Sequence, residues 1–259
     1  MYEYGGINMK MKMVLILMSV ILLSGCGSNP SSKSEDKKLY EGLNGLETYK
    51  EAASYFNKNI TYYKSESSDD ASHSYNEYFQ TDNGIATVTK ALYSDAELTT
   101  LNYNIVNGKD YHTLFMLDSV TYKYSVAHDY TKHIDNMYND LSKQQGVKII
   151  DVKREDKDGQ IVLTMKVEQE QRYQESDQSD EIVYYINELT INKDGYICEE
   201  KATYYTDDKF EDISYQGLTT KLFDYNKREA KDLDSEIELV KSCDGLNEDE
   251  VKDKIQLQW

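Results

Sequence analysis

Apolar and polar positions follow two different rhythms along this chain, and the change of rhythm separates its elements. Residues 46–57 (LETYKEAASYFN) place their apolar side chains three or four positions apart, which gathers them on one face of a helix of about three turns. Residues 119–127 (SVTYKYSVA) instead alternate between apolar and polar, which is the period of a half-buried strand. The first rhythm predicts an amphipathic helix, and the second predicts β-structure after it.

Alternation of the second kind recurs along most of the chain. The strands that it predicts cover residues 60–67, 74–80, 85–93, 98–106, 110–117, 119–127, 147–153, 160–168, 181–191, 196–206 and 210–225. Turns that contain Gly separate several of them, for example Asn83-Gly84 and Asp158-Gly159, because these residues tolerate the positive φ angles of tight hairpins. Such a series of strands with one wet face is typical of an antiparallel sheet.

A second helical pattern interrupts the strands. Residues 129–145 bring their apolar side chains to one face, with Asp129 placed to cap the start and Gly146 directly after the end. From residue 227 onwards the chain is acidic and weakly patterned, apart from a short capped helix predicted over residues 247–255. The predicted order is therefore helix, strands, helix, strands.

The N-terminal region has a different character from the body. Residues 13–23 (MVLILMSVILL) form an uncharged run that follows Lys10 and Lys12. A basic start, a short apolar run and a small-residue exit are typical of a secretory signal that is removed from the mature protein. At 1.5 Å per residue the run covers only about half of a ~30 Å hydrocarbon core, so it is a poor transmembrane span.

The exit of this run carries the sharpest motif of the chain. Leu-Ser-Gly-Cys at residues 23–26 resembles the lipobox of bacterial lipoproteins. The resemblance implies cleavage between Gly25 and Cys26 and a diacylglyceryl group on the Cys26 thiol. It also implies a protein that is lipid-anchored to the cell membrane and faces the extracytoplasmic side. An ordinary secretory signal with a chance Cys is the alternative.

These patterns give a domain organisation. Residues 1–25 are expected to be the lipoprotein signal peptide, and residues 26–38 a Ser-rich flexible tether. Residues 39–259 are long enough for a single β-rich domain with an acidic C-terminal tail. Two half-modules, residues 39–127 and 128–226, of cystatin or nuclear-transport-factor type are the alternative.

The net charge narrows the range of partners. The chain carries 47 acidic and 29 basic residues, a formal net charge of −18. This excess disfavours nucleic acid, because phosphate binding needs clustered Lys and Arg. It also disfavours electrostatic attraction to anionic lipid. We therefore expect membrane contact through the acyl anchor alone.

Two cysteines remain after Cys26, namely Cys198 and Cys243. An even number in an exported chain allows one disulfide, which would close a long loop and stabilise the fold by a few kcal/mol. Their positions in the sequence do not fix the distance between their Cα atoms, so two free thiols are the alternative. No His lies near them in the sequence, so they do not form a metal signature.

The lipidated start and the element order together resemble the LolA/LppX-like half-barrel lipoproteins over residues 39–226. The resemblance implies an α+β fold, a curved antiparallel half-barrel-like sheet with an N-terminal helix and a central helix packed on it. It also implies an apolar cavity that can hold a lipid acyl chain. No ligand-binding residue transfers, because the resemblance rests on element order. The strand faces depart from the family in carrying Tyr and Thr more than Leu, Ile and Phe.

Motifs for chemistry are weak throughout. His128, Asp129 and His133 cluster near the second helix, but a spacing of five places the two imidazoles well apart around a helix. Residues 156–159 (DKDG) lead straight into a predicted strand and fit a hairpin turn better than a calcium loop. Nucleophile-elbow, P-loop and dinucleotide motifs do not occur in the sequence. We therefore expect a non-catalytic protein without a metal or cofactor.

Tyrosine is unusually frequent, with 24 residues that include the doublets Tyr62-Tyr63, Tyr184-Tyr185 and Tyr204-Tyr205. Adjacent strand residues face opposite sides of a sheet, so each doublet gives one ring to each face. Two functions follow. One is a carrier that binds an apolar or amphipathic ligand on a concave sheet face. The other is a cell-surface module that binds glycan or protein through exposed tyrosine rings, which present an apolar face and a polar tip.

Overall fold

The structure is a computed structural model that describes residues 39–68, 73–82, 84–93, 96–106, 110–117, 121–127, 136–171 and 181–256. The predicted signal peptide, Gly25, Cys26 and the tether lie outside the described residues. The elements are α1 (Gly45–Asn59), β1 (Tyr62–Ser68), β2 (His73–Thr81), β3 (Gly84–Tyr93), β4 (Ala96–Val106), β5 (Asp110–Leu117), β6 (Thr121–Ala127), η2 (Leu141–Lys143), β7 (Val147–Lys157), β8 (Gln160–Gln171), β9 (Glu181–Ile191), β10 (Ile197–Tyr205), β11 (Ile213–Phe223), η3 (Ala230–Leu233), α2 (Asp234–Ser242) and α3 (Glu248–Gln256).

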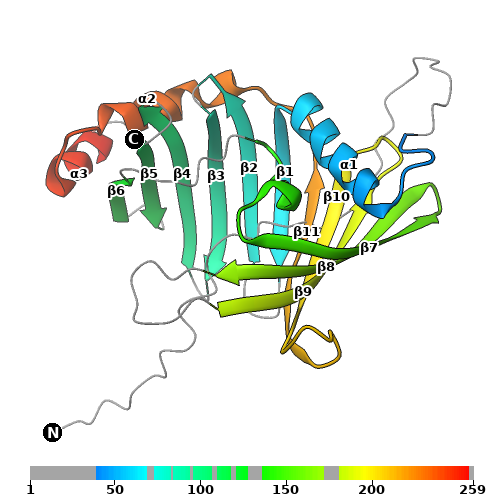
Figure 1. Ribbon diagram of the computed structural model, residues 1–259. Coiled ribbons are helices and arrows are strands. Elements are labelled where there is room, and N and C mark those ends of the chain that lie inside the picture. Colours follow the sequence, from blue (N-terminus) through cyan, green and yellow to red (C-terminus); the bar gives the residue numbers. More distant parts are fainter. Residues whose placement is uncertain are drawn as a thin grey trace, which may run out of the picture.

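The described strands form one 11-stranded sheet in the order β6-β5-β4-β3-β2-β1-β11-β10-β9-β8-β7 (Figure 1). Every pairing is antiparallel. The sheet is not closed into a barrel, since β6 and β7 stand at opposite edges of this order. The predicted antiparallel sheet is confirmed. The α+β class holds only in part, because the described residues contain few helices beside this sheet.

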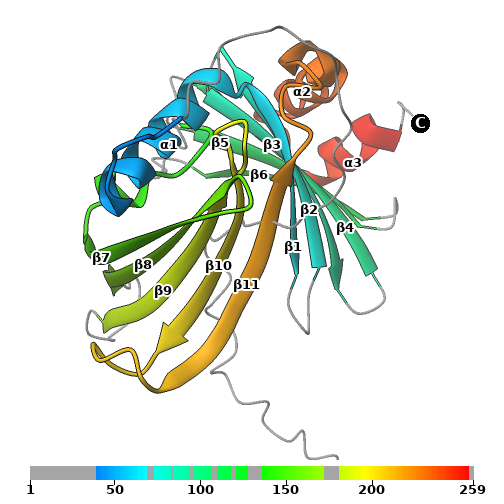
Figure 2. The same ribbon diagram turned by 90° about the vertical axis from the view of Figure 1, so that its right-hand side faces the viewer.

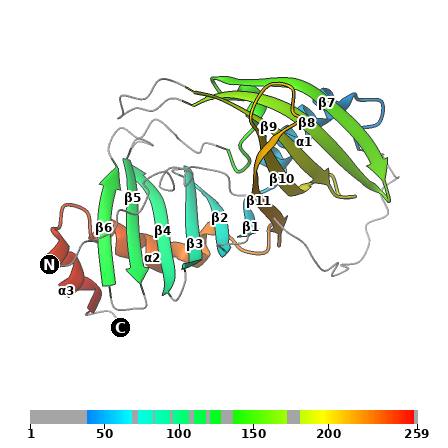
Figure 3. The ribbon, with the colours of Figure 1, turned by 90° about the horizontal axis from the view of Figure 1, so that it is seen from below.

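The sheet consists of two meanders joined in the middle. We call β1 to β6 the N-terminal half-sheet and β7 to β11 the C-terminal half-sheet. Within each half every strand pairs with its neighbour in sequence, and the pairing of β1 with β11 joins the two. Figure 3 shows the halves set at an angle to each other.

The two faces of the sheet carry separate cores, and the strands β1 and β2 contribute side chains to both. Tyr63 and Tyr78 point to the face that α1 covers, which we call the α1 face, and their rings stack 4.4 Å apart. Tyr62 and Phe79 point to the opposite face, the α2 face, with ring centroids 4.8 Å apart. Because side chains alternate along a strand, the first tyrosine doublet sends one ring into each core.

Helix α1 covers the C-terminal half-sheet. It packs against β7 and β10, and its buried residues Tyr49, Ala52, Ala53 and Phe56 face that half. Their partners are the apolar side chains of the α1 face, among them Leu163, Met165, Val167, Tyr185, Leu189, Ile191 and Leu222. Asn44 caps the helix by accepting a hydrogen bond from the Glu47 amide, as the capping-box pattern requires. The predicted helix over residues 46–57 is confirmed.

The helices of the C-terminal segment cover the N-terminal half-sheet on the opposite face. Leu233 and Ile237 pack on Tyr62 and Phe79. Val240, Cys243 and Val251 pack on Leu101 and Leu114 of β4 and β5. Figure 2 shows α1 on one side of the sheet and α2 and α3 on the other.

The helices at each end of the chain therefore cover the half-sheet formed by the other part of the chain. The first helix covers the last strands, and the last helices cover the first strands. The short helix predicted over residues 247–255 is confirmed as α3, with Asn247 capping it through the Asp249 and Glu250 amides. Helix α2 was not predicted. The described chain contains no helix that is long and apolar enough to cross a membrane.

The central helix predicted over residues 129–145 is wrong where the structure describes it. Residues 136–145 contain only the 3-10 turn η2, and residues 129–135 lie outside the described chain. The Tyr138 amide donates to Asn57 Oδ1 at 2.6 Å, and its carbonyl accepts from Asn57 Nδ2 at 3.0 Å. These tertiary bonds use the backbone groups that a helix would pair internally, while Met137, Tyr138 and Leu141 enter the α1-face core.

Turns that contain Gly join neighbouring strands of the C-terminal half-sheet, as the sequence predicts. Asp158 and Gly159 both have positive φ, 53° and 77°, and join β7 to β8 in a tight hairpin rather than a calcium loop. Gly195, with φ 84°, closes the turn between β9 and β10. Gly217 coincides with a register shift between β10 and β11, where a Cβ atom would lie 3.0 Å from the Ala202 carbonyl oxygen.

Candidate functional site

The two cysteines that the sequence left open for pairing lie on different elements. Cys198 is on β10, and Cys243 follows α2 in the core of the α2 face. Both are buried free thiols. Burial raises the pKa of Cys198 to about 12, and burial also raises the pKa of Cys243, so both stay neutral and poorly nucleophilic at pH 7.

The other two tyrosine doublets also split between the faces. Tyr185 is fully buried in the α1-face core, next to Tyr204 at 5.4 Å. Tyr184 and Tyr205 point to the other face and make edge contacts with Phe210, at 6.1 and 5.6 Å. The prediction that each doublet divides its rings is confirmed. These rings pack mainly on one another, which makes them a structural feature of the sheet end.

Polar side chains occupy the α1 face of the N-terminal half-sheet. The Thr89 hydroxyl donates to Asn76 Oδ1 at 2.8 Å, and Asn76 Nδ2 donates to the Ser65 hydroxyl at 3.2 Å. On the next row, the Ser67 hydroxyl donates to Thr220 Oγ1 at 3.1 Å. Ser65, Ser67 and Asn76 are buried, so these bonds satisfy groups that would otherwise destabilise the fold.

This polar row ends at Glu200, which pairs with Thr220 in the ladder. Glu200 is buried and accepts a hydrogen bond from the Tyr138 hydroxyl. Burial raises its pKa to about 7, an effect that the Tyr138 hydrogen bond opposes. Tyr49 and Tyr63 bind the segment that contains Tyr138. Tyr49 Oη accepts a hydrogen bond from the Leu141 amide, and Tyr63 Oη donates one to the Met137 carbonyl.

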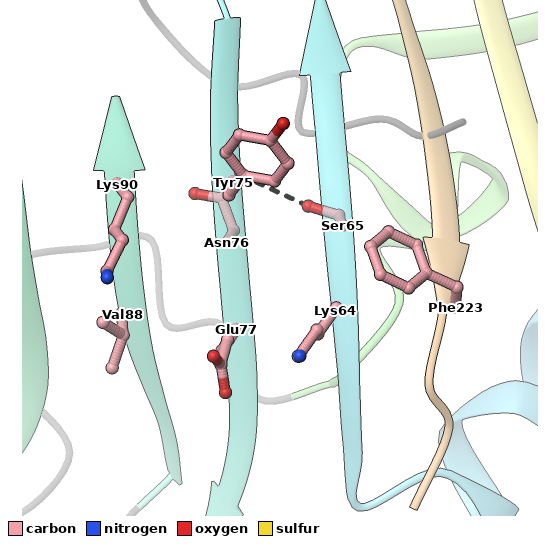
Figure 4. A pocket seen from close by; sticks show the side chains of 8 residues that line it. All are labelled: Lys64, Ser65, Tyr75, Asn76, Glu77, Val88, Lys90 and Phe223. Atoms are coloured by element: carbon pink, nitrogen blue, oxygen red, sulfur yellow. Dashed lines mark hydrogen bonds between the residues drawn. The ribbon is translucent and has the colours of Figure 1, made fainter. Parts of the chain in front are cut away.

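A pocket lies on the α2 face near the junction of the two half-sheets. The side chains of Lys64, Tyr75, Glu77, Val88, Lys90 and Phe223 surround it, and the strand residues Ser65 and Asn76 complete its lining (Figure 4). Its volume is about 130 Å³. We call it the α2-face pocket. Its members come from four neighbouring strands and meet because alternate residues of paired strands share one face.

Charge and aromatic surface coexist in this pocket. Glu77 of β2 lies opposite Lys64 of β1 and Val88 of β3, and Lys90 of β3 lies one row away, opposite Tyr75 (Figure 4). Its carboxylate accepts from the Tyr62 hydroxyl at 2.9 Å and forms an ion pair with Arg228, whose guanidinium lies over the Phe79 ring. Glu77 is thus held in place by two donors outside the pocket.

Tyr75 offers the largest exposed ring of the α2-face pocket. Its side chain is 43% exposed. The His73 ring lies 4.5 Å from it, and His73 is fixed in turn by a 2.9 Å contact between its Nε2 and Glu66 Oε1. An aromatic ring that is braced on one side and open on the other can stack on a ligand.

A second hollow of about 390 Å³ lies where α2 meets the turn between β2 and β3. Its lining includes Asp82, Lys231, Asp234 and Lys241. Its aromatic residue Tyr103 is only 4% exposed and lies beneath the Lys241 ammonium, so it offers little ring surface. The α2-face pocket is therefore the better candidate for a binding site.

Sequence reasoning missed the residues of the α2-face pocket. They lie on the consecutive strands β1, β2 and β3 and on the distant strand β11, and only the register brings them together on one face. The signal that was present is the charged or aromatic side chain at every second position of β1 and β2, such as Lys64, Glu66, Tyr75 and Glu77.

No protein-family model matches the chain, and no curated protein is significantly similar to it. Within the described ranges, no three or more His, Cys, Asp or Glu side chains gather as metal ligands would. His128 and His133 lie outside those ranges.

Proposed function

We propose that the protein is a membrane-anchored extracytoplasmic lipoprotein that binds glycan at the α2-face pocket. The observation that carries this proposal is the combination of a braced, exposed Tyr75 ring with the polar side chains of Lys64, Glu77 and Lys90. A sugar presents an apolar ring face and a rim of hydroxyl groups. The ring face stacks on an aromatic side chain, and the hydroxyl groups bond with carboxylates and ammonium groups.

The size of the pocket supports a short contact with a longer ligand. A volume of about 130 Å³ is smaller than the roughly 300 Å³ at which pockets for drug-sized molecules begin. One unit of a polymer fits this volume, and the neighbouring units would extend over the open α2 face of the C-terminal half-sheet. That face carries Glu188, Lys201 and Thr219 rather than an apolar surface.

A carrier for an apolar or amphipathic ligand is the second candidate. It is favoured by the open sheet, whose edge strands β6 and β7 do not pair with each other. Two observations weigh against a long acyl chain. The apolar part of the α1 face is filled by α1 and residues 137–141, and the remaining part carries buried hydroxyl and amide groups. We therefore place glycan first.

The test is a binding measurement on the mature chain. Incubated with a panel of oligosaccharides and with phospholipid, the protein is expected to retain an oligosaccharide, seen by native mass spectrometry and quantified by calorimetry. Tyr75→Ala is expected to weaken this binding at least tenfold. Tyr215→Ala is the matched control, since Tyr215 is 40% exposed but lies outside the pocket. Retention of phospholipid without any oligosaccharide would favour the carrier instead.

The anchor is tested separately. Cells that express the full chain are expected to hold it in the membrane fraction, with a mass that reports cleavage before Cys26 and addition of lipid. Cys26→Ser is expected to release it to the soluble fraction. Secretion of the wild-type chain without lipid would contradict the proposed anchor and leave the glycan proposal standing.

A further inference from the structure

The α2-face pocket carries more positive charge than its carboxylates neutralise. The acidic Glu77 is already matched by Arg228. Lys64 contacts Asp224 at 3.4 Å, but the same carboxylate is closer to Lys227, at 2.7 Å. The carboxylate of Asp224 is therefore shared by two ammonium groups. Its hydrogen bond from Lys227, together with the nearby charge of Lys64, holds the pKa of Asp224 below its usual range.

Lys90 adds a further ammonium group beside Lys64, which shares the carboxylate of Asp224. Among the described residues no carboxylate forms an ion pair with it, and its side chain lies on the same face as Glu77 and Lys64 (Figure 4). The chain as a whole has a formal net charge of −18, so a local surplus of positive charge is unusual on this surface. A ligand that brings negative charge here replaces repulsion between ammonium groups by attraction.

The nearest other charged groups are already engaged. Glu66, one row from Lys64 and opposite Tyr75, contacts His73 Nε2 at 2.9 Å and faces the cationic Lys221 across the β1–β11 ladder, so Lys221 rather than the neutral His73 offsets its charge. It therefore does not cancel the surplus at Lys64 and Lys90. The aromatic wall, Tyr75 and Phe223, remains next to the two ammonium groups.

We propose that the α2-face pocket selects sugars that carry an acidic group, a carboxylate or a phosphate, held between the ammonium groups of Lys64 and Lys90. This inference rests on the proposed glycan binding and narrows it to acidic glycans. The sugar ring stacks on Tyr75 while its acidic group receives charge-assisted hydrogen bonds from the two lysines. Glu77 accepts hydrogen bonds from the sugar hydroxyl groups and disfavours a second acidic group close by.

The test compares an acidic probe with its own neutral form. Oligogalacturonate and the same oligosaccharide with its carboxylates methyl-esterified are titrated into the mature chain at low salt. The acidic form is expected to bind about tenfold or more tightly, and added salt is expected to reduce the difference. The double variant Lys64→Gln/Lys90→Gln is expected to lose this preference, so that it binds the acidic form no more tightly than the methyl ester.

Lys148→Gln/Lys209→Gln is the matched control. These two exposed lysines each contact one acidic residue outside the pocket, and their removal changes the net charge by the same amount. Poly(glycerol phosphate) is then tested as a competitor of oligogalacturonate. Competition for the wild-type chain that is lost in the Lys64→Gln/Lys90→Gln variant would extend the proposal to phosphate. A lack of competition would remove phosphate from it.

Two outcomes overturn the inference and are distinguishable. If both forms of the probe bind equally and depend on Tyr75, the pocket binds glycans without acid selection, and only this inference fails. If no oligosaccharide binds a folded wild-type chain, the proposed glycan function fails with it.

Discussion

The two half-sheets have the same antiparallel architecture but bury opposite faces. In the C-terminal half-sheet the α1 face is apolar and packed, and the α2 face is charged and wet. In the N-terminal half-sheet the α2 face is packed under α2 and α3, while the α1 face carries serine, threonine and asparagine. The buried face changes from one side of the sheet to the other at β1 and β2. There Tyr63 and Tyr78 enter the core under α1, while Tyr62 and Phe79 enter the core under α2. A sheet can therefore bury both faces while each half buries one.

This change of buried face also explains where the candidate site lies. The pocket forms near the line where the helical cover of the N-terminal half-sheet ends and the open surface of the C-terminal half-sheet begins. A site at such a border rests on packed strands and remains accessible to solvent on the side that no helix covers. Neither half-sheet alone provides both.

The largest expected effect comes from truncating a large buried side chain in one of the two cores. Phe56→Ala, in α1, is expected to lower the free energy of unfolding by about 4 kcal/mol, and Ile237→Ala, in α2, by about 3 kcal/mol. Because β1 joins both cores, each variant should shift one cooperative urea transition. Glu51→Ala, on the exposed side of α1, is the control. Two separate transitions, each sensitive to one variant, would show that the halves fold independently.

The buried carboxylate of the C-terminal half-sheet gives the next effect. The pKa of Glu200 rises from 4.5 to about 7 on burial, so the folded chain binds this proton more tightly than the unfolded chain. The contribution is fully present below pH 4.5 and is lost as the pH rises through 7, a difference of about 3 kcal/mol. Urea denaturation between pH 5 and 8 should show this decline, and Glu200→Gln should flatten it. The exposed Glu188→Gln variant should retain the wild-type profile. Parallel profiles for wild type and Glu200→Gln would contradict the assignment.

The polar face of the N-terminal half-sheet should be sensitive to loss of a single hydroxyl. Thr89→Val keeps the side-chain shape but removes the donor to Asn76 Oδ1, and an unsatisfied buried acceptor costs about 1–2 kcal/mol. The measurement is again the urea midpoint. Thr219→Val, on the other face, should be nearly neutral. An unchanged midpoint for Thr89→Val would mean that solvent reaches Asn76, and the contrast between the half-sheets would then be weaker than described.

The smallest effect concerns the start of α1. Asn44→Ala removes the cap and should lower the free energy of unfolding by about 1 kcal/mol, because the Glu47 amide loses its acceptor. Lys50→Ala, exposed in the middle of the helix, is the control. Equal midpoints for the two variants would show that packing on the C-terminal half-sheet alone sets the position of α1.

The sequence by itself determined most of the local elements, with helix α2 and residues 136–145 as exceptions. Strict alternation located the strands, and Asp158 and Gly159 marked their hairpin because few other residues adopt positive φ so readily. Helical spacing and Asn44 located α1 in the same way. Each of these signals acts within a few residues, which is why it can be read without the fold.

Only the tertiary structure decided how these elements combine. Residues 136–145 have a helical pattern, yet Asn57 and Glu200, from distant parts of the chain, bind Tyr138 and hold the segment in another conformation. The α2-face pocket depends on the register of β1, β2, β3 and β11, and alternation within one strand does not say which face will be covered. That choice was made by α1 and α2 from opposite ends of the chain, because burial of apolar surface is decided by what packs against a face.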